Sequence, residues 1–172
     1  MSFIIGDQPE VTGITLVTAA GNPIDNYRIF SLSQFERNQF NDYNQSKYLL
    51  TTFRCNPSPE YNCHGMSFAS RRTNIDKATV IRTILADDKY KRIDNIKETL
   101  IGDIVLYVSV SDGDIMHSGT LVLCEHSDAD LSNIRVLSKW GKYKEAIHPL
   151  RETGYKDYKL EFYRLTHEHY EL

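Results

Sequence analysis

The fold is organised around residues 60–70, which read Glu60-Tyr61-Asn62-Cys63-His64-Gly65-Met66-Ser67-Phe68-Ala69-Ser70. Pro57 and Pro59 precede this stretch, and because proline interrupts helical hydrogen bonding, a helix is predicted to begin after Pro59, with Asn62 as its N-cap. Cys63 then lies in the first turn, where unpaired backbone N–H groups and the helix dipole stabilise a thiolate. Such an environment lowers the pKa of a thiol from about 8.5 and creates a nucleophile. Most free cysteines are instead small buried hydrophobes, so other residues must decide between the two interpretations.

The composition indicates one globular domain. The chain has 172 residues, of which 41% are hydrophobic and 25% charged, with a net charge of -3, and these values are ordinary for a protein with a single core. The charge gives no reason to expect a nucleic-acid partner. The apolar runs are too short to span a membrane, no secretory signal is recognisable, and three cysteines form no disulfide framework. We therefore expect a protein that is cytoplasmic as synthesised, with export by a dedicated secretion system left open.

Helices are predicted in the first half of the chain and strands in the second. Apolar spacing predicts helices over residues 31–53 and 76–90, after a short strand near 13–18. Runs of β-branched and aromatic residues predict four further strands, over residues 104–110, 115–123, 134–140 and 158–165. Asp112-Gly113 between the first two of these four strands is typical of a hairpin turn.

This order of elements predicts a single α+β domain over residues 1–172. No repeat or linker divides the chain. Its expected parts are an N-terminal extension over 1–54, a core over 55–141, and a C-terminal strand and tail over 142–172.

A thiol nucleophile needs a base within hydrogen-bond reach, and that base is usually histidine. His64 is a poor candidate because adjacent residues on a helix point in different directions. Three other histidines lie in an acidic loop or in the C-terminal tail: His126, His167 and His169. His117 stands early on the return strand of the predicted hairpin and is followed by small residues. Because a rigid strand facing a helix N-terminus suits a nucleophile–base pair, the sequence favours a Cys63–His117 dyad.

Three short motifs follow one another through the middle of the chain. They are Asn62-Cys63-His64-Gly65, Gly102-Asp103-Ile104-Val105-Leu106-Tyr107 and His117-Ser118-Gly119-Thr120-Leu121-Val122. Together they resemble the NlpC/P60 branch of the papain-like cysteine peptidases, in which a helix-borne cysteine precedes a Gly-Asp strand and a histidine strand. The resemblance covers about residues 55–141. It implies a papain-like α+β fold, with N-terminal helices packed on a small antiparallel meander.

The resemblance also implies a third residue that orients the base. By order this residue falls within 136–141, where the family often has histidine and this chain has Ser138, and His148 is the alternative. A further departure is His64, which stands where the family usually has serine. In the implied chemistry the Cys63 thiolate attacks an amide carbonyl. His117 takes the thiol proton and later protonates the leaving amine.

The leading hypothesis is a cysteine peptidase or amidase without a cofactor, for which the resemblance implies bacterial cell-wall peptides as substrate. An acyltransferase or deamidase effector would use the same dyad, and a binding module would keep the scaffold with an idle dyad. A metal site built from Cys63, His64 and His117 lacks the spacing of common zinc sites. The expected partners are a peptide or peptidoglycan-type substrate and, for an effector, an inhibitor or immunity protein.

Overall fold

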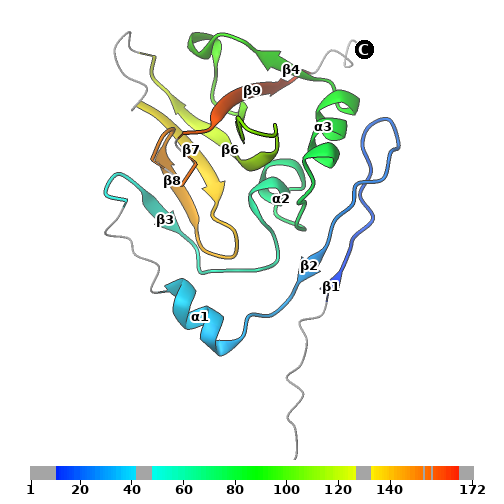
Figure 1. Ribbon diagram of the computed structural model, residues 1–172, viewed down its shortest axis with the longest axis vertical. Helices are drawn as coiled ribbons and strands as arrows, with labels where there is room; N and C mark the ends of the chain where they lie inside the picture. Colours follow the sequence, from blue (N-terminus) through cyan, green and yellow to red (C-terminus); the bar gives the residue numbers. More distant parts are fainter. Residues whose placement is uncertain (1–10, 42–47, 127–132, 153, 156, 167–172) are drawn as a thin grey trace, which may run out of the picture.

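The fold is dominated by a seven-stranded antiparallel sheet (Figure 1). The computed structural model describes residues 11–41, 48–126, 133–152, 154–155 and 157–166. In chain order the strands of this sheet are β3 (Thr52–Arg54), β4 (Tyr90–Ile93), β5 (Ile104–Val108), β6 (Ile115–Cys124), β7 (Ile134–Lys139), β8 (Glu145–Pro149) and β9 (Lys159–Leu165). Their spatial order is β3-β8-β7-β6-β5-β9-β4, and each neighbouring pair is antiparallel.

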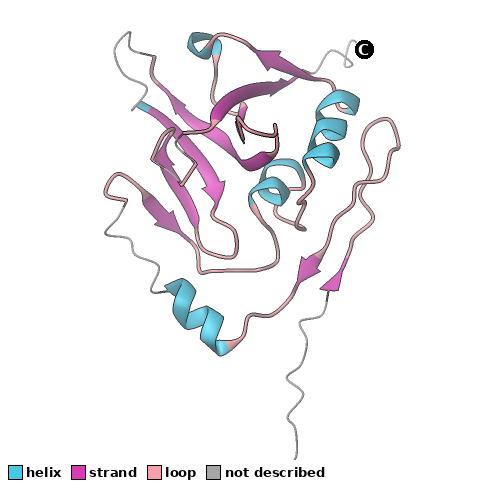
Figure 2. Ribbon diagram, viewed as in Figure 1, coloured by secondary structure: helices cyan, strands magenta, loops and turns pink. Residues whose placement is uncertain are grey.

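The remaining elements are short and lie around this sheet (Figure 2). They are the two-stranded ribbon of β1 (Val11–Thr12) and β2 (Arg28–Ile29), the helices α1 (Gln34–Asn41), α2 (Cys63–Phe68) and α3 (Ala78–Asp87), and the 3-10 turn η2 (Ile96–Glu98). In Figure 1, α2 and α3 lie between the large sheet and the β1–β2 ribbon. This arrangement places the start of α2 near β6 and β7.

The interior strand β5, between β6 and β9, carries the core on both of its faces. Successive side chains of a strand point to opposite faces, and all five residues of β5 are buried. One face packs with α3 and the segment before it through Ile81, Ile84 and Ile75. The other face packs against residues of β6, β7 and β9, and against Leu150. Because both faces of β5 are buried, a shift of this strand would misplace its packed side chains. The register of its pairing with β6 is therefore fixed.

The expectation of a papain-like α+β fold, with N-terminal helices on a small meander, is wrong. The described part of the chain is mostly β, and its α-helices have only 8, 6 and 10 residues. Of the helix predicted over 31–53, the described residues form only α1, in which Phe35 stays 75% exposed and adds little packing. Residues 42–47 lie outside the described residues, and residues 52–54 form the edge strand β3.

Other predicted elements are confirmed within a few residues. The helix over 76–90 is α3, and the strands over 104–110, 115–123, 134–140 and 158–165 are β5, β6, β7 and β9. The strand near 13–18 is wrong, since this segment makes only an isolated bridge between Val17 and Pro23. Besides the short strands β1, β2 and β3, two strands had no expected counterpart, β4 and β8. The first begins directly after Lys89, whose positive φ of 58 ends α3.

Candidate active site

Asn62 fixes the start of α2, as predicted for an N-cap. Its Oδ1 accepts hydrogen bonds from the backbone N–H groups of Gly65 at 2.8 Å and Ile75 at 3.2 Å. Its Nδ2 donates to the Ile75 carbonyl and to the Asp76 carboxylate, both at 2.8 Å. The amide therefore ties the helix start to the chain that returns after the helix. Cys63 is held as the first residue of α2.

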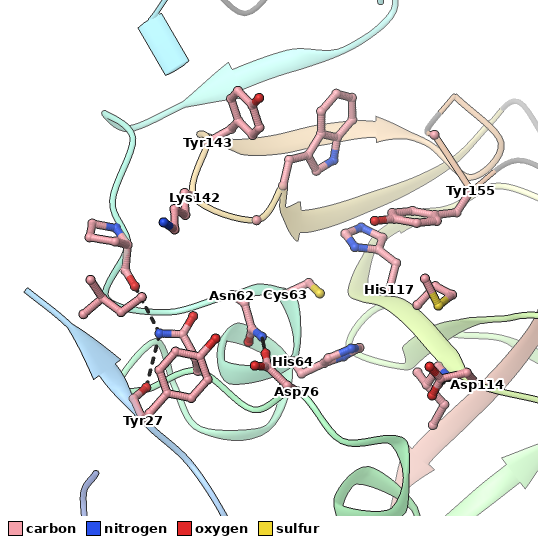
Figure 3. A pocket seen from close by; sticks show the side chains of 18 of the residues that line it. Tyr27, Asn62, Cys63, His64, Asp76, Asp114, His117, Lys142, Tyr143 and Tyr155 are labelled. Atoms are coloured by element: carbon pink, nitrogen blue, oxygen red, sulfur yellow. Dashed lines mark hydrogen bonds between the residues drawn. The ribbon is translucent and has the colours of Figure 1, made fainter. Parts of the chain in front are cut away.

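Cys63, His64 and His117 line one cavity of about 580 Å³ (Figure 3). Cys63 and His64 come from α2 and His117 from β6, so the structure brings the two members of the predicted dyad to the same place. Residues before α1, the β7–β8 turn and the segment between β8 and β9 complete the walls. The cavity is rich in aromatic side chains, which are Tyr27, Tyr48, Trp140, Tyr143 and Tyr155.

The pKa of the Cys63 thiol is held well below its usual range. Burial by itself raises this pKa, but the charges of His64 and His117 and their hydrogen bonds to the thiol outweigh it. Burial lowers the pKa of His64, yet its charge interaction and hydrogen bond with Cys63 outweigh that effect and raise it. The two opposite shifts indicate a thiolate–imidazolium pair, the reactive form of a catalytic cysteine.

His64 belongs to the site, although sequence reasoning set it aside as a base. Its ring is 4% exposed, and Nδ1 shares a 2.9 Å hydrogen bond with the Ser118 hydroxyl. Ser118 in turn lies 3.0 Å from the Ser67 hydroxyl. The rule that adjacent helical residues diverge holds along a helix. At the first turn of α2 both side chains still reach the cavity beyond the helix end.

Ser138 does not orient His117 through a hydrogen bond in the described part of the chain. The Ser138 hydroxyl lies 2.9 Å from His148 Nε2 and accepts from the Trp140 indole N–H at 3.1 Å. His148 Nδ1 lies 2.9 Å from the Pro149 carbonyl, which can only accept. Nδ1 therefore carries the proton, and Ser138 donates to Nε2.

His148, the alternative orienting residue, is also committed elsewhere. Burial lowers the pKa of His148 to about 3, so the ring is neutral at physiological pH. Both of its ring nitrogens are occupied, by Ser138 and by the Pro149 carbonyl. Its centroid lies 6.4 Å from that of His117. Ser138 and His148 thus form a buried pair beside the site.

Ser138→Ala is expected to reduce stability and leave the reactivity of Cys63 nearly unchanged. The substitution leaves His148 Nε2 and the Trp140 N–H without their partner, which costs about 1–3 kcal/mol for buried polar groups. Chemical denaturation and the alkylation rate of Cys63 measure the two effects. The exposed Ser111→Ala serves as control. A large loss of Cys63 reactivity in a folded Ser138→Ala protein would instead place the serine in the catalytic site.

A buried lysine joins two loops that contribute to the wall of the cavity. Lys139 is 1% exposed, and its Nζ donates to the backbone carbonyls of Ser58, Gly141 and Tyr143. Ser58 lies in the loop before Cys63, and the other two acceptors lie in the β7–β8 turn. The three donors of the ammonium group are matched by three acceptors, so one side chain fixes both loops.

The end of α2 is anchored by a second buried charge. Glu145 on β8 is 2% exposed and accepts from Arg71 Nε at 2.5 Å and from the Tyr61 hydroxyl at 2.8 Å. Arg71 follows α2 with a positive φ of 65. Because Arg71 pairs with the buried Glu145 of β8, it holds the end of α2 against the sheet.

Comparison of the chain with family models, with curated proteins and with solved structures gave no significant match. Within the described ranges, no group of three or more His, Cys, Asp and Glu residues is arranged to hold a metal ion. None of the helices in the described residues is long and apolar enough to cross a membrane. Function therefore has to be inferred from the geometry of the cavity itself.

Proposed function

We propose that the protein is a cysteine-dependent amide hydrolase with Cys63 as nucleophile. The observation that carries this proposal is the Cys63 thiol, whose pKa is lowered by two imidazoles at the wall of a cavity. A buried structural cysteine has a raised pKa and no adjacent base. The combination of thiolate, imidazoles and cavity supports nucleophilic catalysis.

In the proposed reaction the thiolate attacks the carbonyl carbon of an amide. His117, carrying the proton that it has taken from the thiol, donates it to the nitrogen as the C–N bond breaks, and the amine leaves. Water then attacks the resulting thioester while His117 takes one of its protons, and the C–S bond breaks to release the acid and restore the thiolate beside the protonated His117. His64 remains beside the sulfur as the charged group that stabilises the thiolate.

The start of α2 supplies the groups that can stabilise the oxyanion. The N–H of Gly65 is taken by the Asn62 side chain and that of Met66 by the Asn62 carbonyl. The N–H groups of Cys63 and His64 precede these and have no acceptor within the helix itself. They are therefore the donors nearest to a carbonyl bound at the sulfur.

A peptide is the substrate that the cavity supports best. Its volume of about 580 Å³ falls in the range of small-molecule sites, about 300–1,000 Å³. Its aromatic walls suit the side chains and planar peptide groups of a peptide substrate. The sequence motifs imply cell-wall peptides, which have both. Transfer to an amine instead of water uses the same thioester, so product analysis with and without an added amine separates hydrolase from acyltransferase.

Selective alkylation tests the nucleophile. At pH 6, iodoacetamide is expected to label Cys63 much faster than Cys55 or Cys124, because a lowered pKa keeps Cys63 ionised below the usual range of thiols. Burial raises the pKa of Cys124, which slows that site further. The rate at Cys63 should fall only when the pH drops below its own low pKa. Mass spectrometry of each thiol, with Cys63→Ala as control, gives the rates. Equally slow labelling of all three would reject the proposal.

A further inference from the structure

The ring of His117 is packed between aromatic side chains. Its centroid lies 5.0 Å from that of Tyr155, with an angle of 21° between the planes, so the two rings are stacked. Tyr107 on β5 packs at 5.3 Å and 51°. His117 itself is 2% exposed. Figure 3 shows the Tyr155 ring beside His117 at the edge of the cavity, where it approaches from the segment between β8 and β9.

Apart from its hydrogen bond to the Cys63 thiol, polar contacts do little to hold this ring. Among the described residues His117 Nε2 is buried and has no hydrogen-bond partner. Ser138 and His148, the two residues expected to orient it, bind each other. A catalytic imidazole usually needs a third group that fixes its plane. In this site the contacts that fix the plane are aromatic.

We propose that Tyr155 is the positioning residue of His117, and that its ring takes the place of the polar third member of a catalytic triad. A near-parallel tyrosine ring restricts rotation of the imidazole and so keeps it directed at the Cys63 thiol, to which it hydrogen-bonds. Tyr155 is in turn supported by Tyr158, which packs edge-on at 5.5 Å and 76°. This inference rests on the proposed function, since it assigns a role in the same site.

Other titratable groups also face His117, and the test must keep them constant. They are Cys63 and His64 of α2, Tyr107 of β5 and His148 of β8. Substitution at Tyr155 leaves all four unchanged. A change in the pH profile of a Tyr155 variant can therefore be assigned to the loss of the stacked ring.

The test compares Tyr155→Leu with Tyr155→Phe, using the alkylation rate of Cys63 as a function of pH together with turnover. Tyr155→Leu is expected to raise the acidic midpoint of the profile by about one pH unit, and so to slow alkylation about tenfold at pH values below the wild-type midpoint, because the imidazole no longer keeps its charge and hydrogen bond at the thiolate. Tyr155→Phe should keep the wild-type profile. Tyr90→Leu, which removes a half-buried tyrosine ring that packs on Phe68 and does not line the cavity, is the matched control.

The outcomes separate this inference from the proposed function. If wild-type Cys63 is unreactive at pH 6, the proposed function fails. If wild-type Cys63 is reactive and Tyr155→Leu matches either the wild type or Tyr90→Leu, the positioning role of Tyr155 is wrong while the proposed function stands. If Tyr155→Phe loses as much as Tyr155→Leu, the hydroxyl and not the ring matters, and stacking is rejected. Thermal melts verify that each variant is folded.

Discussion

Replacement of His117 by glutamine is expected to lower amide turnover by about 10²–10⁴-fold at every pH, which is the usual contribution of a general acid–base residue. Glutamine fills similar space but cannot carry the proton between the thiol, the leaving amine and water. Raising the pH cannot compensate, because hydroxide replaces neither the acid nor the positioned base. The value of kcat measured from pH 5 to 10 checks this.

His64→Gln provides the matched comparison, since His64 lies in the same cavity and is equally buried. Without the His64 imidazolium the pKa of Cys63 rises. Turnover should then be low at neutral pH and recover at alkaline pH, where the thiol ionises unaided. If His64→Gln stays inactive at all pH values and His117→Gln recovers, the two histidines have the opposite roles.

Gly65→Ala is expected to destabilise the protein by about 3 kcal/mol or more and to lower its Tm by about 10 °C. A Cβ on Gly65 would lie 1.6 Å from the carbonyl oxygen of Thr73. No side-chain movement relieves this contact, because the obstacle is backbone. Moving the Thr73 segment would also disturb Ile75, whose N–H and carbonyl are both bound by Asn62. The cap of α2 and the position of Cys63 should be lost together.

Gly154→Ala is the control for this substitution. A Cβ at Gly154 meets no atom within 4 Å, so alanine there should be neutral or slightly stabilising through the unfolded chain. Calorimetry of both variants gives the comparison. Equal melting temperatures for Gly65→Ala and the wild type would show that the Thr73 carbonyl does not pack closely against Gly65 of α2.

The parts of the fold with local signals could be predicted from sequence. The cap at Asn62, the hairpin of β5 and β6 around Gly113, and α3 are each encoded by a few adjacent residues. The strand β8 carries no such signal, because Glu145, His148 and Pro149 are uncommon in a strand interior. These polar side chains are buried only because Arg71 and Ser138, distant in the sequence, supply their partners.

The candidate site was predictable to a similar extent. Cys63 and His117 were found from their predicted positions at a helix start and on a strand. Order along the chain predicts Ser138 as the residue that orients His117. This order cannot reveal that the Ser138 hydroxyl faces His148. Tyr155 lies between the core predicted over 55–141 and the strand predicted over 158–165, and has no motif around it. Its contact with His117, which is distant in the sequence, exists only in the folded chain.

The buried ammonium of Lys139 has a consequence for ligand recognition. Because one cation bonds to Ser58 in the loop before Cys63 and to Gly141 and Tyr143 in the β7–β8 turn, this part of the cavity wall is fixed before any ligand arrives. A substrate then loses little affinity to ordering of these loops, so its shape decides how well it binds. Molecules that do not fit the fixed wall should be excluded at the encounter step, with association rates that drop sharply as side-chain width increases.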